Sequence, residues 1–303
     1  MVGSEAVSVV VSAYSKERLD CVLECVNSVR NQSFPPKEII LVLDPDRQLM
    51  EAYQSRVPSY VKIIASEGFG LSNARNAGVK SAQGEIVAFI DDDAVADVNW
   101  LKNLVRNYDD SNVVGVGGAI NPLWENGCPA WFPEELNWVV GCSYKGLPEQ
   151  KALVRNPIGC NMSFRKDVLM KVGLFRSDIG RFGKRLLAGE ETELSLRILS
   201  KIKGSKIIYD PAAKVYHRVS KNRVTPKYLW GRSFCEGVSK ALITSRSPAL
   251  SAENKYLKYL IEVTVPSKLR HGYRFGNLCQ LLVLACSTCA VFVGFSLTRI
   301  SRS

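Results

Sequence analysis

Three adjacent aspartates, Asp91, Asp92 and Asp93, are the residues of this chain whose types and spacing point most clearly to chemistry. They directly follow the apolar run 86–90, whose branched and aromatic side chains predict a buried strand. In open α/β sheets, ligands bind at the carboxyl ends of strands. Neighbouring carboxylates repel one another, and their oxygens suit Mg²⁺ or Mn²⁺. The pattern predicts a metal site that neutralises a phosphorylated ligand, and the alternative is a solvated acidic turn.

The elements that must position this triplet alternate between strands and helices. Apolar runs predict strands at residues 7–13, 39–43, 61–65 and 86–90. Helical spacing of apolar residues predicts helices at residues 18–30, 73–81 and 100–108. This alternation predicts an α/β fold with a mostly parallel sheet.

The second half of the chain is less regular. Residues 120–158 are rich in Pro, Gly and Trp and show no strong period, so we expect an irregular region on the substrate side. Beyond them we expect a strand at 209–216 and helices at 190–201 and 228–244.

Several segments together resemble the family 2 nucleotide-sugar glycosyltransferases. In chain order they are residues 7–14, 70–78, 82–93, 159–165, 189–197 and 216–218. Each segment is short, but the ordered set covers residues 7 to about 240. The resemblance implies the glycosyltransferase type-A fold, a Rossmann-like sheet flanked by helices. It also implies a nucleotide-diphospho-sugar donor and a Mn²⁺ or Mg²⁺ ion.

The resemblance assigns roles on the donor side. Asp93 resembles the metal ligand that bridges to the diphosphate. Asp91 resembles the position that faces the ribose, and we expect it to be a metal ligand as well. His217 stands where family members place a late metal ligand, although a lone histidine after a strand is usually structural. The residues expected at the donor nucleotide are Asp44, Asn73, Arg75, Asp91 and Asp92. For Asp44 the alternative is an Asp-Pro turn.

The segment 189–197 resembles the motif that carries the catalytic base. The family usually has Glu-Asp where this chain has Glu190 and Glu191, so we expect Glu191 to be the base and Glu190 its rival. The base takes the proton from an acceptor hydroxyl that attacks the anomeric carbon. The alternative for both residues is a favourable acidic first turn of a helix. On the acceptor or diphosphate side we expect Asn161, Arg218 and Arg223.

The chain is strongly basic, with a formal net charge of +11, and its Lys and Arg residues concentrate in residues 201–240. Such a face can meet nucleic acid, anionic lipid or a phosphorylated substrate. Because no zinc-finger, homeodomain or RNA-recognition signature is present, we expect no nucleic-acid partner. Nine irregularly spaced cysteines argue against a disulfide framework.

Residues 278–297 contain no charged side chain, and basic residues flank them on both sides. About 20 apolar residues span a bilayer as a helix, so we predict a transmembrane helix, with a buried core helix as the alternative. We read no N-terminal signal peptide and expect the catalytic domain to face the cytoplasm from the cell membrane. The predicted parts are a catalytic domain at 1–245, an amphipathic juxtamembrane segment at 246–277, the span at 278–297 and a basic tail at 298–303.

The sequence therefore predicts a membrane-associated, metal-dependent, inverting glycosyltransferase. Its donor is expected to be UDP-linked and to carry a hexose or a hexuronic acid. Several segments, among them 129–135 and 237–241, resemble archaeal enzymes that extend dolichyl-phosphate-linked glycans for N-glycosylation, which implies a hydroxyl of a lipid-linked saccharide as acceptor. The alternatives are a polyprenyl-phosphate sugar synthase and a membrane-tethered basic binding module.

Overall fold

A computed structural model describes residues 6–181, 186–244, 251–270 and 275–301 of the protein. The chain divides into two compact units. The first comprises Met1–Asn121, Pro148–Arg185 and Glu190–His217, and the second comprises Pro122–Leu147, Leu186–Gly189 and Arg218–Ser303. The first unit contains most of a nine-stranded sheet formed by the described residues, and the second contains the helices of the C-terminal region. This division does not test the four parts predicted from the sequence, which stay predictions. Residues 246–250 and 271–274 of the predicted juxtamembrane segment and residues 302–303 of the predicted tail, with some of the basic residues that flank the span, lie outside the described residues.

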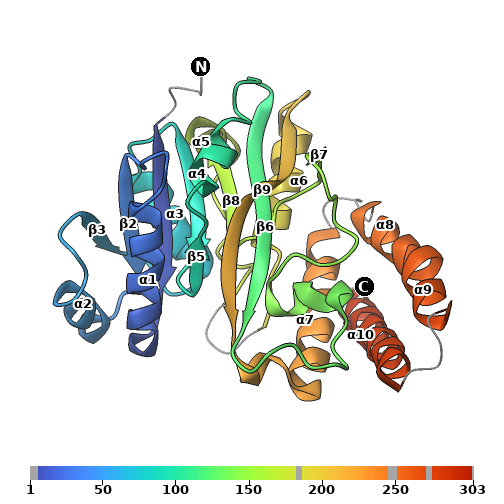
Figure 1. The fold of residues 1–303 in the computed structure, drawn as a ribbon. Coiled ribbons are helices and arrows are strands. Elements are labelled where there is room, and N and C mark those ends of the chain that lie inside the picture. The colour runs from blue at the N-terminus through green and yellow to red at the C-terminus, as the bar shows by residue number, and fades with distance from the viewer. Residues whose placement is uncertain (1–5, 182–185, 245–250, 271–274, 302–303) are drawn as a thin grey trace. The chain divides into compact units, whose positions relative to one another are not determined.

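The four strands predicted from the apolar runs form the parallel part of the sheet (Figure 1). They are β1 (Val7–Ala13), β2 (Glu38–Leu43), β3 (Val61–Ala65) and β4 (Ile86–Asp91). β1 pairs in parallel with β2 and β4, and β2 pairs in parallel with β3. Because the carboxyl ends of parallel strands meet at one edge, Asp44 after β2 and Asp91 at the end of β4 lie along the same edge.

Helices cover both faces of these strands, which explains why the strands read as nearly continuous apolar runs. Figure 1 shows α1 on the near face and α3 on the far face. The helices of this half are α1 (Leu19–Arg30), α2 (Arg47–Gln54), α3 (Leu71–Ser81) and α4 (Trp100–Val105). A short 3₁₀ turn, η1 (Lys16–Arg18), precedes α1. The helix α2 was not predicted; its N-cap is Asp46, whose side chain accepts a hydrogen bond from the Leu49 amide at 2.8 Å.

The rest of the sheet is antiparallel. Its strands are β5 (Ala94–Ala96), β6 (Val113–Trp124), β7 (Ala152–Leu153), β8 (Asn161–Arg165) and β9 (Lys206–Val219). β8 pairs with β4 and β6, and β9 pairs with β5 and β7. The long strand β6 was missed from the sequence because its glycines lower strand propensity. One of them, Gly118, is required by packing, since a Cβ atom there would fall 1.9 Å from the Ala213 carbonyl oxygen.

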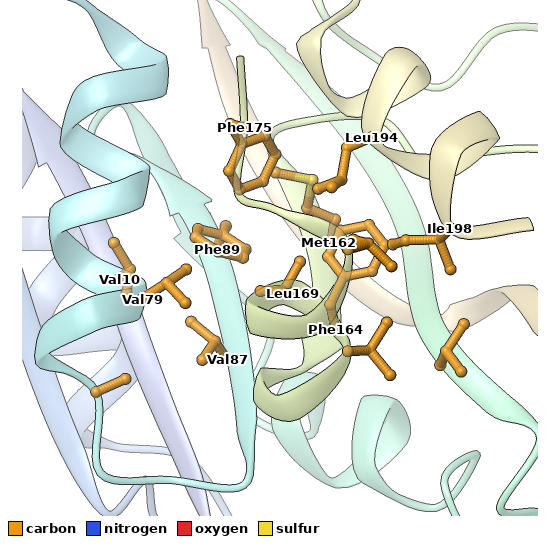
Figure 2. Close-up of a cluster of buried hydrophobic side chains, with 14 of the residues drawn as sticks. Val10, Val79, Val87, Phe89, Met162, Phe164, Leu169, Phe175, Leu194 and Ile198 are labelled. Atoms are coloured by element: carbon orange, nitrogen blue, oxygen red, sulfur yellow. The ribbon is translucent and has the colours of Figure 1, made fainter. Parts of the chain in front are cut away.

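A buried apolar cluster joins the parallel and antiparallel parts of the first unit (Figure 2). The ring of Phe89 on β4 meets the ring of Phe175 edge-on, with 5.5 Å between centroids. Phe164 on β8 lies beside Ile198 on the predicted helix α6 (Glu190–Lys201), and α5 (Lys166–Val172) adds Leu169. The cluster fixes the ends of β4 and β8 and the start of α6 relative to one another.

The second unit is mainly helical. Its elements are η2 (Glu134–Val140), η3 (Lys221–Arg223), α7 (Pro226–Thr244), α8 (Ser251–Tyr259), the π-helical η4 (Leu260–Thr264), α9 (Val265–Arg270) and α10 (Phe275–Ile300). α7 and α10 pack closely. A Cβ atom on Gly237 would lie 2.0 Å from the Val291 carbonyl oxygen, and one on Gly294 would lie 2.2 Å from that of Phe234. Small residues at such contacts are typical of helices that associate within membranes.

Residues 276–300 of α10 are long and apolar enough to cross a membrane, with a mean hydropathy of 2.2 in the most apolar window. Only 22% of that window is buried within the protein. A helix in the core of a soluble protein is mostly buried, so the low burial favours a membrane helix over the alternative of a core helix.

Candidate active site

The aspartate triplet lies at the end of β4, where the sequence predicted it. Asp91 is the last residue of the strand and is partly exposed, whereas Asp92 and Asp93 are buried. Arg18, from the turn before α1, forms ion pairs with Asp92 and, at 3.2 Å, with Asp93. Burial and the charges of Asp93 and Asp91 raise the pKa of Asp92 to about 8, although Arg18 opposes this rise. Three neighbouring carboxyl groups thus stand beside one adjacent arginine, and this crowding disfavours the charged form of Asp92.

Strand pairing brings His217 to the triplet. The short strand β5 begins directly after Asp93 and pairs with β9, in which Ala94 lies opposite His217. The Nε2 atom of the buried His217 is consequently 3.1 Å from Oδ1 of Asp93. The structure thus brings together the three residues predicted as metal ligands, Asp91, Asp93 and His217.

One further residue of this cluster was missed from the sequence. The carboxylate of Asp91, the thiol of Cys160 and the imidazole of His217 place one ligand atom each within 4.8 Å of one another. Cys160 directly precedes Asn161 in a segment that the sequence analysis singled out, so its position in that motif was the available signal. Carboxylates and an imidazole form a donor set that a divalent cation such as Mn²⁺ accepts.

Arg75 connects the triplet to the start of α6. It projects from α3, is almost fully buried, and its guanidinium donates to Oε1 of Glu190 at 2.8 Å and to the carbonyl oxygen of Gly159 at 3.0 Å. The same guanidinium lies 3.5 Å from Oδ1 of Asp91 and stacks over the ring of Phe175. Arg75 therefore connects Asp91, a predicted metal ligand, to Glu190, one of the two carboxylates predicted as the base.

The two predicted base candidates differ in their surroundings. Glu190 is buried, and within the described part of the chain its second oxygen, Oε2, has no hydrogen-bond partner. Glu191 is partly exposed and accepts a hydrogen bond from the Thr192 hydroxyl at 3.2 Å. Both stand in the first turn of α6, where the helix dipole favours the ionised carboxylates. Glu190 is thus held by a fixed cation, and Glu191 is the more accessible of the two.

Two residues predicted to contact the nucleotide, Asp44 and Asn73, form hydrogen bonds with the loop between β3 and α3. The carboxylate of Asp44 accepts a hydrogen bond from the Gly70 amide at 3.2 Å. Burial raises the pKa of Asp44, and the Gly70 hydrogen bond opposes this rise. The side-chain amide nitrogen of Asn73 donates a hydrogen bond to the Phe69 carbonyl oxygen at 2.9 Å. Gly70 has a φ of 101°, a conformation that favours glycine. The loop therefore reaches the same sheet edge as the triplet.

The side chain of Asn161 is hydrogen-bonded within the sheet and is not exposed to a ligand. Its side chain is fully buried, and its amide nitrogen donates to the carbonyl oxygens of Ala119 and Ala213 at 2.9 and 2.8 Å. Its carbonyl oxygen accepts from the indole of Trp100 at 2.8 Å. Because both amide hydrogens are used inside the sheet, we replace the predicted acceptor contact of Asn161 with a structural role.

The two basic residues predicted on the acceptor or diphosphate side belong to the second unit. Arg218 lies in the last residues of β9, and Arg223 lies in η3. Their contact with a ligand stays a prediction.

Known proteins resemble this chain over most of its length. Residues 8–173 match the description of Glycosyl transferase family 2. A glucosyl-dolichyl phosphate glucuronosyltransferase of Haloferax volcanii is 34% identical over 297 residues, which is 95% of each chain. The succinoglycan biosynthesis protein ExoM of Rhizobium meliloti is 25% identical over 205 residues, 65% of this chain and 62% of that protein.

Solved structures agree with these relatives at the level of the fold. A mannosyltransferase, PcManGT, of Pyrobaculum calidifontis in complex with GDP-Man and Mn²⁺ superposes with a TM-score of 0.61 at 15% identity and covers 98% of this chain and 87% of that one. GalNAc-T7 with UDP, GalNAc and Mn²⁺ gives 0.53 at 16% identity, covering 86% and 57%. The predicted type-A α/β fold is confirmed by these likenesses. Since the family description matches more than half of the chain and the archaeal relative matches nearly all of it, this protein belongs to glycosyl transferase family 2.

Proposed function

We propose that this protein transfers a hexuronic acid or a hexose from a UDP-sugar to a hydroxyl of a dolichyl- or polyprenyl-phosphate-linked saccharide, with inversion at the anomeric carbon. The single observation that carries the acceptor class is the 34% identity to a glucosyl-dolichyl phosphate glucuronosyltransferase over 95% of both chains. The likeness extends through the C-terminal region as well as the part that contains the sheet. Glucuronic acid and glucosyl-dolichyl phosphate are therefore the first donor sugar and acceptor to test.

The residues at the end of β4 suit the donor side of this reaction. Asp91, Asp93 and His217 would hold a Mn²⁺ or Mg²⁺ ion, which supplies a Lewis acid that stabilises the departing nucleoside diphosphate. Asp44 and Asn73 stand at the same sheet edge for the nucleotide, and a carboxylate such as Asp44 can accept the imide N–H of uracil. The contact of Asp92 with the donor stays a prediction; its carboxylate forms an ion pair with Arg18.

The acceptor side needs a base. The acceptor oxygen attacks the anomeric carbon as its proton passes to a carboxylate, and the bond from that carbon to the diphosphate oxygen breaks. Glu191 is the more accessible carboxylate for this proton, while Arg75 keeps Glu190 oriented beside Asp91. A phosphate acceptor is already anionic and needs no base, so this pair favours a hydroxyl acceptor over the reaction of a polyprenyl-phosphate sugar synthase.

The C-terminal helix suits a lipid-linked acceptor. We propose that α10 crosses the cell membrane and that the described residues 251–270 of the predicted juxtamembrane segment lie along its surface. We also propose that the catalytic domain faces the cytoplasm, which contains the nucleotide sugars. Most of α10 is not covered by the protein itself. The exposed apolar side chains of Ile261 on η4 and Leu269 on α9 lie in the same helical segment as the exposed Lys258 at the end of α8. Such a mixture of apolar and basic side chains is typical of helices that lie at a membrane surface.

The proposed activity is tested directly by offering donors and acceptors to the detergent-solubilised full-length protein. We expect UDP-glucuronic acid with glucosyl-dolichyl phosphate and Mn²⁺ to give a product that is larger by one sugar, detected by mass spectrometry. Dolichyl phosphate without the sugar should give no product. Transfer to dolichyl phosphate itself would favour the polyprenyl-phosphate sugar synthase, and retention of bound nucleic acid or lipid without any transfer would favour the binding module.

Metal dependence is expected from the cluster of Asp91, Asp93 and His217. Asp93→Ala should lower transfer by at least ~10²-fold, a loss typical of removing an electrostatic contact to developing charge. Chelation should abolish transfer, and added Mn²⁺ should restore it. Asp109→Ala, which changes an exposed aspartate, is the matched control and should keep its rate. Full transfer in excess chelator would contradict the metal assignment.

The base assignment is tested with amide variants of the first turn of α6. Glu191→Gln should lower transfer by ~10²–10⁴-fold, the usual contribution of general base catalysis, while donor binding measured by calorimetry stays unchanged. Glu193→Gln, which alters the ion pair with Arg197, is the control within the same helix. Glu190→Gln removes the charge that Arg75 faces, so we expect a lower denaturation temperature. A normal rate in Glu191→Gln together with an inactive but stable Glu190→Gln would move the base to Glu190.

Membrane attachment is tested by removing residues 276–303. Because the truncated protein lacks the exposed apolar helix, we expect it in the soluble fraction with donor hydrolysis largely retained. Transfer to a lipid-linked acceptor should fall more than transfer to a short, soluble analogue. A full-length protein that stays in solution without detergent would refute the anchor. A truncated protein that unfolds would show that the contact of α10 with α7 is needed for folding.

A further inference from the structure

The thiol of Cys160 gives the predicted metal centre a ligand of a different kind. Cys160 is buried, and its sulfur lies in the same group of atoms, all within 4.8 Å of one another, as a carboxylate oxygen of Asp91 and a ring nitrogen of His217. We propose that Cys160 is a further ligand of this centre, and that the centre therefore binds thiophilic cations such as Zn²⁺ in competition with Mn²⁺ or Mg²⁺. The inference rests on the proposed function only in that Zn²⁺ would then inhibit sugar transfer.

The sheet places the thiol at the triplet. β4 and β8 run antiparallel with Ile90 opposite Asn161, so the residue before Asn161 comes next to the residue after Ile90, which is Asp91. The pairing of β5 with β9 puts His217 opposite Ala94, directly after the triplet. The three ligand residues thus lie on or next to three strands of one sheet, in the same unit of the protein.

The backbone around Cys160 is fixed on both sides. On one side, the carbonyl oxygen of Gly159 accepts a hydrogen bond from Arg75 at 3.0 Å, and a Cβ atom on Gly159 would lie only 2.9 Å from that guanidinium. On the other side, the backbone N–H of Asn161 donates a hydrogen bond to the Ile158 carbonyl oxygen at 3.0 Å. The side chain of Asn161 is hydrogen-bonded inside the sheet. Ligands held in this way need little reorganisation on binding a cation.

The three ligand atoms lie close enough to converge on a four-coordinate ion. In a tetrahedral zinc site with bonds of about 2.0–2.3 Å, two ligand atoms lie roughly 3.3–3.8 Å apart. Atoms that lie within 4.8 Å of one another therefore reach this spacing by side-chain movements of up to about 1 Å. Oδ1 of Asp93, 3.1 Å from the His217 ring, is within reach as the fourth ligand. The thiol loses its proton when it binds, and that proton is released to solvent. Magnesium takes oxygen ligands and has little affinity for a thiolate.

The number of protein ligands determines whether the bound ion can also bind the sugar donor. Catalytic centres keep a position open, whereas centres with four protein ligands are closed. A Zn²⁺ ion held by Asp91, Asp93, His217 and Cys160 leaves no position for a diphosphate oxygen. A Mn²⁺ or Mg²⁺ ion that does not use the thiolate keeps positions available for the donor.

The test uses the detergent-solubilised full-length protein and Co²⁺ as a spectroscopic probe of zinc sites. Thiolate coordination gives a sulfur-to-cobalt charge-transfer absorption, which we expect in the unmodified protein and in the control Cys21→Ser, whose cysteine lies on α1. The absorption should be lost in both Cys160→Ser and Cys160→Ala, and added Zn²⁺ should displace it. Zinc affinity measured by competition should fall by about 100-fold or more in these variants, since even residues behind the ligands contribute 10–100-fold.

Inhibition provides the second measurement. With each protein normalised to its own rate in Mn²⁺, Zn²⁺ should inhibit Cys160→Ser only at much higher concentration than the unmodified protein and Cys21→Ser. A charge-transfer absorption that persists in both Cys160 variants, or that is absent from the unmodified protein while Mn²⁺ still binds, would overturn the inference. A normal absorption in a protein that transfers no sugar from any donor would instead refute the proposed function and leave the zinc site standing.

Discussion

The negative charge gathered at the end of β4 is the constraint on which the rest of the site depends. Three consecutive carboxylates, two of them buried, are unfavourable unless cations or donors surround them. Arg18 lies against the two buried carboxylates, Arg75 approaches Asp91, and His217 faces Asp93. These partners come from the segment before α1, from α3 and from β9. A site with this much charge therefore requires the sheet and both helices to be in place.

The same constraint explains two features that look unrelated in the sequence. The short strand β5 pairs with β9 directly after the triplet, which brings the imidazole to the carboxylates. The buried guanidinium of Arg75 contacts Glu190, and the cluster around Phe89 and Phe175 fixes both ends of this contact. Removing one partner from such a buried pair leaves an uncompensated charge. Arg75 therefore connects the start of α6 to the end of β4 and holds Glu190 and Asp91 in one arrangement.

In the second unit, the packing of α7 against α10 restricts which residues the chain can have. α7 and α10 approach each other so closely that glycines are needed at Gly237 and Gly294, while most of the apolar surface of α10 faces away from the protein. Within α7, the ion pairs of Glu236 with Arg232 and Lys240 satisfy charges that would otherwise be costly beside an apolar helix. Burial alone would raise the pKa of Glu236, but the two cations lower it to about 2, so this carboxylate stays ionised.

The sequence by itself determined the parallel strands, the helices α1, α3 and α4, the aspartate triplet, the long apolar C-terminal helix and the family. Each of these follows from a local pattern of apolar periodicity, turn residues or an ordered motif. The contribution of Cys160, the role of Arg18 and the buried position of Asn161 were decided by tertiary structure alone. Each depends on the antiparallel pairing of β8 with β4 and of β9 with β5, or on a contact between residues far apart in the chain. The strand β6 was missed for a related reason. Its glycines lower the local propensity for strand, but the close approach of β6 to β9 leaves no room for a side chain at Gly118. Local periodicity reports which face of an element is buried, but the partner that covers that face is set by the packing of the whole sheet.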